Sequence, residues 1–179
     1  MILSDRDLRE RGTSIIAPFT EECVQPSSYD LTLDCKLAVP IPYRTIDLRV
    51  DEPREHMKFV DFDSYELLPG QAILACTKEV VKCPLDLSAR IEGKSSLGRL
   101  FMAVHITAGV IDAGFSGQVT LEVVNHGPWT IVIWSGMKIA QVSYFLLTRA
   151  CETPYGSSKL GSHYLDQRGP TPATGRRGK

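Results

Sequence analysis

Short runs of strand-forming residues recur along most of this 179-residue chain, with turn residues between them. Gly, Pro, Asn or Asp separate the runs at a spacing of roughly ten residues, which is typical of an all-β sandwich or barrel and not of alternating βαβ units. A chain of this length is expected to form one domain with a substantial core. The expected strands lie within residues 28–39, 65–81, 88–93, 100–108, 117–125, 130–134 and 138–148.

Two short helices are expected beside these strands. Ser4 precedes the charged run Asp5–Glu10 and Gly12 follows it, which are signals for the start and the end of a helix. A second helix is predicted over Ser95–Leu100, where the two serines at its start can cap the first turn.

The composition of the chain changes near residue 153. Residues 1–152 are expected to form a single β-domain, and residues 153–179 a flexible C-terminal tail rich in Gly, Ser, Pro and basic residues. One interpretation of this tail is a frayed terminus. However, Tyr155, Tyr164 and Gln167 suit a lid that orders over a charged ligand, and composition leaves both interpretations open.

The charge of the whole chain gives no indication of a nucleic-acid or membrane partner. The net charge is −1, so a phosphate-bearing ligand has to be met by a local cluster of cations. Residues 1–12 lack the apolar core of a signal peptide, and no apolar run approaches the length of a membrane span. We therefore expect a cytoplasmic protein.

The five cysteines and four histidines are scattered along the sequence. No CxxC pair occurs, and no HxE is followed by the PCxxC of zinc-dependent nucleoside deaminases. Buried free thiols are expected, and a zinc site is not.

A cluster of cations and hydroxyls lies at the predicted second helix. Lys94, Ser95, Ser96 and Arg99 combine positive charge with hydroxyls and free N–H groups at a helix start, which suits an anion such as phosphate. The alternative is a capped surface turn whose charges are solvated.

Two acids follow this cluster. Strand periodicity in residues 119–124 places Thr120, Glu122 and Val124 on one face, and partial desolvation among such aliphatic neighbours makes a carboxylate a better base. The alternative is a solvent-facing strand position. Asp112 lies in a Gly-bounded turn, where an acid commonly caps the backbone. Since Asp112 and Glu122 flank one hairpin-like unit, both are expected to face one cleft.

Several blocks of the sequence, taken in order, resemble one family over almost the whole chain. The chain resembles the dCTP deaminase branch of the dUTPase superfamily, and the combination of blocks makes the resemblance specific. The blocks are ILSDRDL (2–8), VQPSSYDLTLDC (24–35), EGKSSLGR (92–99), TAGVIDAGFSGQVTLEVVN (107–125), GMKIAQ (136–141), PYGSSKLGS (154–162) and QRGPTP (167–172).

The resemblance implies a distorted β-barrel or jelly-roll-like fold with short helices, forming homotrimers with active sites between subunits. It implies conversion of dCTP to dUTP and ammonia without zinc, with Mg²⁺ bound through the triphosphate. Glu122 is then the catalytic base, paired with Arg99, and it activates a water held near Ser95 and the Ala108 carbonyl. The implied substrate-binding residues are Lys94, Ser95, Ser96, Arg99, Ala108, Gly109, Asp112, Gln141, Tyr155, His163 and Gln167.

A second reaction is implied by the turn Ala108-Gly109-Val110. Deaminases that stop at dUTP resemble Ala-His-Arg there, whereas the Ala-Gly form resembles bifunctional members that also hydrolyse dUTP to dUMP and pyrophosphate. In those members an aspartate matching Asp112 helps to place the attacking water. We favour the bifunctional enzyme; a monofunctional dCTP deaminase, a dUTPase-only protein and a nucleotide sensor remain alternatives. Inhibition by dTTP is also open.

The chain departs from the family pattern at several positions. Phe101 and Met102 replace a usual Gly-Leu pair, which changes the expected local packing. His163 stands where a tail lysine is common, which weakens the expected contact with the terminal phosphate. Residues 41–63 match no function.

Overall fold

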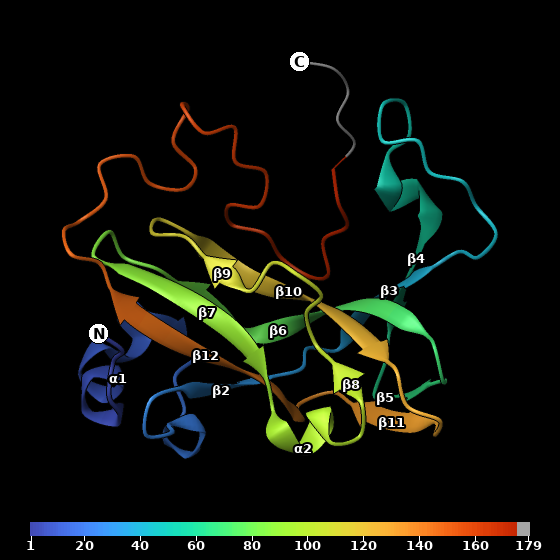
Figure 1. Ribbon diagram of the computed structural model, residues 1–179, viewed down its shortest axis with the longest axis horizontal. Coiled ribbons are helices and arrows are strands. Elements are labelled where there is room, and N and C mark those ends of the chain that lie inside the picture. Colours follow the sequence, from blue (N-terminus) through green and yellow to red (C-terminus); the bar gives the residue numbers. More distant parts are fainter. Residues whose placement is uncertain (175–179) are drawn as a thin grey trace.

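The computed structural model describes residues 1–174 and is built mainly from strands in three sheets (Figure 1). Each element follows a run that the sequence marks with strand-forming residues or with a helix cap. In chain order the α-helices (α), 3₁₀ helices (η) and strands (β) are α1 (Asp5–Arg11), η1 (Gly12–Ser14), β1 (Ile16–Ala17), η2 (Glu21–Cys23), β2 (Tyr29–Thr32), β3 (Lys36–Pro40), η3 (Pro53–His56), β4 (Met57–Asp61), β5 (Ser64–Leu67), β6 (Ala72–Lys82), β7 (Leu87–Gly93), α2 (Ser95–Gly98), β8 (Met102–Ala103), β9 (Val110–Ile111), β10 (Ser116–Asn125), β11 (Ile131–Trp134) and β12 (Lys138–Leu146).

The six-stranded sheet carries the candidate base. Its order is β4-β3-β6-β10-β8, and β1 pairs with β6. Glu122 of β10 lies opposite Leu74 of β6, Leu74 lies opposite Ala38 of β3, and Ala38 lies opposite Phe59 of β4. Because residues opposite each other on paired strands share a face, these four form one row across the sheet.

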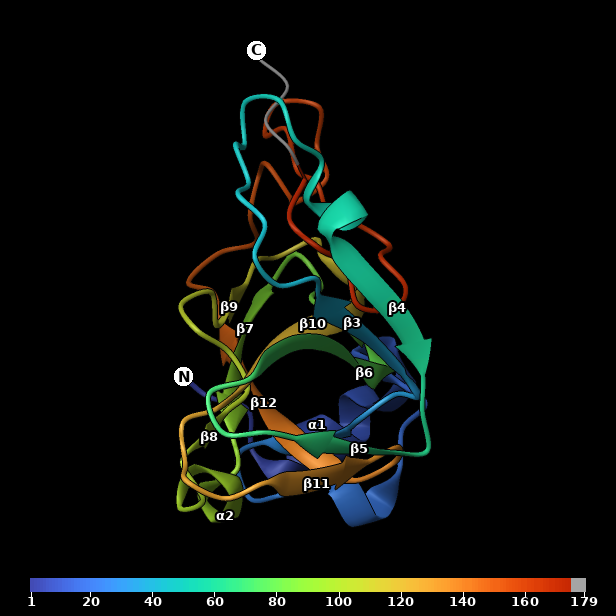
Figure 2. The same cartoon turned by 90° about the vertical axis from the view of Figure 1, so that its right-hand side faces the viewer.

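The other two sheets complete the core. One has the order β2-β12-β7-β9, and the second pairs β11 with β5. Leu121 of β10, Tyr144 of β12 and Ile133 of β11 belong to one hydrophobic cluster and are each 0% exposed. Figure 2 shows β6 arching above β5 and β11. The all-β class is confirmed, although the sheets of residues 1–174 do not close into one barrel.

Both predicted helices are present. Ser4 caps α1, since its Oγ accepts from Asp7 N–H at 3.4 Å and Asp7 Oδ2 accepts from Ser4 N–H at 2.8 Å, and Gly12 ends the helix. The second helix is shorter than predicted. Its N-cap residue is Lys94, without a side-chain cap, so the prediction that Ser95 and Ser96 cap it is wrong.

Two predicted strand runs differ from the structure. The run 28–39 is divided into β2 and β3, because β2 pairs with β12 in one sheet and β3 pairs with β4 and β6 in another. The run 100–108 contains only the short β8, and an irregular loop follows it. One reason is that Ile106 N–H donates to the side chain of Glu122 instead of to a neighbouring strand.

The cysteines agree with the expectation of buried thiols in three of five positions. Cys23, Cys76 and Cys83 are buried and free, Cys151 is partly buried, and Cys35 is exposed. Burial raises the pKa of Cys76 and of Cys83 to about 12, so both remain protonated thiols at neutral pH. In the described residues no helix has the length and apolar character needed to cross a membrane.

Candidate active site

Glu122 projects from the face of β10 that turns away from the core. Leu121 and Val123 on either side point into the core and are 0% exposed, so the alternation predicted from the sequence is confirmed here. One oxygen, Oε2, accepts a hydrogen bond from Ile106 N–H at 3.2 Å. Within residues 1–174 the other oxygen has no hydrogen-bond donor. The carboxylate is therefore oriented by the backbone and keeps one oxygen for a water or a substrate.

The loop that holds Glu122 also carries Ala108 and Gly109. Ile91 N–H donates to the Gly109 carbonyl at 2.8 Å, which fixes the loop against β7. A Cβ at position 109 would lie 3.1 Å from the Ile91 oxygen and 3.4 Å from Cε1 of His105, so a larger residue would force the loop to shift. Ala108 is exposed, and its N–H and C=O have no partner in the described part of the chain.

Asp112 lies directly after β9, in the turn that leads to β10. Its carbonyl accepts from Phe115 N–H at 3.1 Å, and its side chain is exposed, so the predicted turn is confirmed. No hydrogen bond joins Asp112 to Glu122 among residues 1–174. A single cleft that contains both acids stays a prediction.

The cation and hydroxyl cluster on α2 is accessible. Ser95, Ser96 and Arg99 are exposed, and no carboxylate of the described residues lies within 4.0 Å of the Arg99 guanidinium. The predicted pairing of Arg99 with Glu122 is therefore absent within one chain. Figures 1 and 2 both show α2 at the lower edge of the molecule and β9, which precedes Asp112, near the upper edge of the sheets.

Lys94 has a different partner from the one expected. Its Nζ forms an ion pair with Oδ1 of Asp30, a buried side chain, and Lys138 Nζ lies 3.2 Å from Oδ2 of the same carboxylate. Contact of Lys94 with phosphate stays a prediction. Asp30 lies within β2, where its side chain is buried. A lone acid between Tyr29 and Leu31 in an apolar run is the signal that could have found it.

Gln141 joins three segments of the chain. Its Nε2 donates to the Gly93 carbonyl at 3.0 Å, and its Oε1 accepts from Ser28 Oγ at 2.9 Å. Both ends of the amide are thus occupied within the chain. The amide keeps a second N–H and a second lone pair on Oε1, so its predicted contact with substrate stays a prediction.

The tail is irregular but is hydrogen-bonded to the domain. Tyr155 packs edge-to-face on Phe115 with ring centroids 5.7 Å apart, and Tyr155 N–H donates to Ala113 O at 2.8 Å. Gln167 bonds to the backbone of β10, whereas His163 is exposed beside Tyr164. Residues 153–174 of the predicted tail are described by the structure, and residues 175–179 lie outside the described residues.

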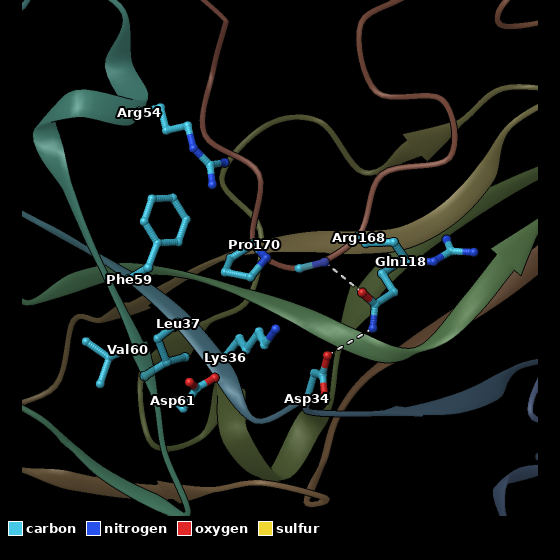
Figure 3. Close-up of a pocket in the computed structure, with 11 residues that line it drawn as sticks. Asp34, Lys36, Leu37, Arg54, Phe59, Val60, Asp61, Gln118, Arg168 and Pro170 are labelled. Carbon is cyan, nitrogen blue, oxygen red and sulfur yellow. Dashed lines mark hydrogen bonds between the residues drawn. The ribbon is translucent and has the colours of Figure 1, made fainter.

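A cavity of about 350 Å³ lies apart from these residues, between β3, β4 and positions 168–170 of the tail (Figure 3). Arg54 of η3 stacks over the ring of Phe59 at 4.4 Å. None of the residues predicted to bind nucleotide lines it. In residues 1–174 no three His, Cys, Asp or Glu side chains are grouped so that they could hold a metal ion.

Comparison with known proteins agrees with the arrangement of these blocks. Residues 2–147 match the family described as dCTP deaminase-like. The chain belongs to the dCTP deaminase-like family. One relative is named "dCTP deaminase, dUMP-forming" in Corynebacterium glutamicum strain R, with 46% identity over 97% of this chain and 95% of that protein. A protein of the same name from Mycobacterium ulcerans is 48% identical over the same shares.

A solved structure supports the fold assignment. The dCTP deaminase from Agrobacterium tumefaciens matches 82% of this chain and 48% of its own chain, with a TM-score of 0.67 and 24% identity. This chain thus spans about half the length of that protein. The chain therefore agrees with the family in the arrangement of its sheets as well as in its sequence blocks.

Proposed function

We propose that the protein deaminates dCTP to dUTP and ammonia and then hydrolyses dUTP to dUMP and pyrophosphate. Family membership supports the first reaction, and relatives named as dUMP-forming support the sequence of both. One observation supports the proposal most directly. Ile106 N–H orients the carboxylate of Glu122, and Ile106 lies in the same loop as Ala108, which is exposed.

The deamination follows from this geometry. Glu122 accepts a proton from a water, and the hydroxide formed attacks C4 of the cytosine. Glu122 passes this proton to the amino group of the tetrahedral intermediate, which leaves as ammonia, and the proton of the new C4 hydroxyl ends on N3 as the carbonyl forms. One water is consumed, and an amino group is replaced by a carbonyl oxygen. The free N–H and C=O of Ala108 are suited to holding the pyrimidine and the water in this position.

The second reaction uses the neighbouring turn. Asp112 is exposed at the end of β9, where its carboxylate can orient a water toward a phosphorus atom of dUTP. Attack at the α-phosphorus breaks the bond to the bridging oxygen and releases pyrophosphate. The Ala108-Gly109 turn, which resembles that of the bifunctional members, supports this assignment; a Cβ at position 109 would already be in tight contact with Ile91 O and His105.

The triphosphate is assigned to α2. Ser95, Ser96 and Arg99 present hydroxyls and a guanidinium without a carboxylate partner in the described chain, which is suited to bidentate contact with phosphate oxygens. Mg²⁺ would be held through the triphosphate oxygens and would neutralise part of the phosphate charge. We also propose dTTP as an inhibitor of the same site, because it shares the deoxyribose and the triphosphate.

The absence of an Arg99–Glu122 pair within residues 1–174 supports a homotrimer. No hydrogen bond or ion pair connects Arg99 with Glu122 within the described chain, so α2 of a neighbouring copy would complete the site. Sedimentation of the full-length protein measures this assembly. Because its substrates are free nucleotides, we place the enzyme in the cytoplasm.

Product analysis tests the proposed function. The purified protein is incubated with dCTP and Mg²⁺, and separately with dUTP, while ammonia, dUTP, dUMP and pyrophosphate are followed. We expect ammonia and pyrophosphate in equal amounts from dCTP, and pyrophosphate from dUTP. Accumulation of dUTP would overturn the second reaction, and binding without ammonia release would indicate a sensor.

A further inference from the structure

The C-terminal tail runs beside β10, close to the position of Glu122. Asp166 N–H donates to Ser116 O at 2.7 Å, and Thr171 N–H donates to Thr120 Oγ1 at 3.1 Å. Thr120 shares the strand face of Glu122. Pro170, between these contacts, is buried. The described end of the tail is therefore placed within two residues of the candidate base along β10.

Gln118 holds this tail through both its backbone and its side chain. Its N–H donates to Gln167 O at 3.1 Å, and its carbonyl accepts from Gln167 Nε2 at 2.7 Å. Its side-chain Oε1 accepts from Gly169 N–H at 2.7 Å. Together these bonds fix both the backbone and the side chain of Gln167, a residue expected to contact the nucleotide.

β10 has a local irregularity beside Gln118. The register against β6 shifts between Gln118 and Thr120, and Val119 N–H donates to Thr77 Oγ1 at 2.9 Å instead of to a strand carbonyl. Such a bulge disrupts the strand ladder locally. On its other edge, in residues 1–174, β10 pairs with β8 only at Val124 and Asn125, so the backbone groups of Gln118 are available to the tail.

Asp34 determines which way the Gln118 amide points. Gln118 Nε2 donates to Asp34 Oδ2 at 2.9 Å, as Figure 3 shows together with the bond to Gly169. An ionised carboxylate only accepts hydrogen bonds, so the NH₂ group must face Asp34 and the oxygen must face the tail. Asp34 is itself fixed, because its Oδ1 accepts from Cys35 N–H at 2.8 Å.

We propose that Gln118 is a positioning residue that holds the tail in register beside Glu122, and that Asp34 orients its amide for this purpose. The role of the docked tail in catalysis rests on the proposed function, whereas the docking itself does not. Gln118 touches no reacting atom. It acts through Gln167 and Gly169.

A swap of donor and acceptor tests the docking. Gln118→Glu places a carboxylate opposite Asp34, and at about pH 8 both groups are charged and repel. The tail should then detach. The double variant Asp34→Asn with Gln118→Glu restores the order of donor and acceptor. The new asparagine amide donates to one oxygen of the new carboxylate, and the other oxygen accepts from Gly169 N–H.

Limited trypsin digestion measures whether the tail is docked on β10, without any assay of activity. The Arg168–Gly169 bond contains the N–H that Gln118 holds, whereas Lys159 lies in an exposed part of the same tail and serves as an internal control. We expect Gln118→Glu to raise cleavage after Arg168, relative to cleavage after Lys159, by about tenfold, as for loss of a charge-assisted hydrogen bond. The double variant should return to the wild-type ratio. An unchanged ratio in Gln118→Glu, or failure of the double variant to restore it, would overturn the proposal.

Kinetics with dCTP test the consequence for the site. The KM of Gln118→Glu should rise about tenfold while kcat changes much less, and both should recover in the double variant. A normal KM with a detached tail would overturn the positioning role. If dCTP is not a substrate at all, the digestion result still stands and only the proposed function fails. Should Gln118→Glu not fold, Gln118→Ala removes the same bond and should give the same cleavage ratio.

Discussion

Glu122 and Asp112 have surroundings that suit two different steps. Ile106 N–H orients the carboxylate of Glu122 on a strand whose neighbouring side chains are buried. The carboxylate of Asp112 is exposed at a turn. Because no hydrogen bond in residues 1–174 joins these acids, changing one leaves the geometry of the other intact. The two reactions should therefore be separable by substitution.

Asp112→Asn should lower pyrophosphate release from dUTP by about a hundredfold, the scale of losing a residue that positions or activates a water. Ammonia release from dCTP should fall by much less, because Glu122 keeps its backbone donor. Parallel assays of the two products on a variant whose assembly matches the wild type provide the measurement. Equal loss of both reactions would assign Asp112 to binding and not to the second step.

At the scale of elements, the tail requires a glycine where it packs against the β-domain. Gly114 has φ +94°, and a Cβ there would lie 2.6 Å from Cβ of Pro154 and 2.9 Å from Tyr155 N. Gly136 has a similar φ of +85°, but no atom lies within 4 Å of the position its Cβ would take. Comparing alanine substitutions at Gly114 and Gly136 therefore distinguishes backbone strain, which both positions share, from a clash with the tail, which only Gly114 has.

Gly136→Ala should lose about 1 kcal/mol of stability, since L-residues disfavour this backbone region, and Gly114→Ala should lose at least as much because it adds a clash. Only Gly114→Ala should displace Pro154 and Tyr155 and raise the KM for dCTP. Urea unfolding and steady-state kinetics measure the two effects. A raised KM in Gly136→Ala, or an unchanged KM in Gly114→Ala, would contradict the requirement for close contact at the tail.

Two carboxylates stabilise helix α1 in their ionised form. The hydrogen bond from the Ser4 hydroxyl lowers the pKa of Asp7, and the hydrogen bond from the Arg11 guanidinium, at 2.7 Å, lowers the pKa of Asp86. The folded protein therefore binds protons at these groups less readily than the unfolded chain, whose aspartates titrate near about pH 3.9. Their contribution is present above that pH and is lost as the pH falls through the folded values.

The urea concentration at the midpoint of unfolding should therefore decrease as the pH drops below about 4. Loss of the stabilising carboxylates at α1 is one cause of this decrease. Asp86→Asn removes one of these groups and should make the decline shallower. A midpoint that rises as the pH drops through this range would contradict the assignment of these carboxylates as ionised partners in the folded state.

At the scale of the whole molecule, local periodicity was enough to predict an all-β protein and the face on which Glu122 lies. Sheet membership was not predictable, because it depends on pairing between distant segments such as β1 with β6 and β11 with β5. The run 28–39 was therefore predicted as one strand, although its two halves join different sheets.

The candidate site was likewise predictable from the sequence only where it depends on neighbouring residues. Local patterns and the family blocks predicted Glu122, Asp112 and the α2 cluster as site residues, since each is encoded within a few residues. Asp30 and Gln118 were missed because their roles depend on partners far along the chain, Lys94 and Gly169 respectively. The predicted Arg99–Glu122 pair is absent within one chain. A pair between two copies of the chain is a property of the assembly, which strand patterns do not encode.

The most direct test of the central claim, that Glu122 is the deaminating base, is the rate of ammonia release from dCTP by Glu122→Gln. Glutamine keeps the shape and the acceptor for Ile106 N–H but cannot take a proton from water. Glu66→Gln, on the exposed side of β5, is the matched control and should retain full activity. We predict that Glu122→Gln binds dCTP with nearly unchanged affinity and releases ammonia at least about a hundredfold more slowly. Deamination near the wild-type rate would contradict the account.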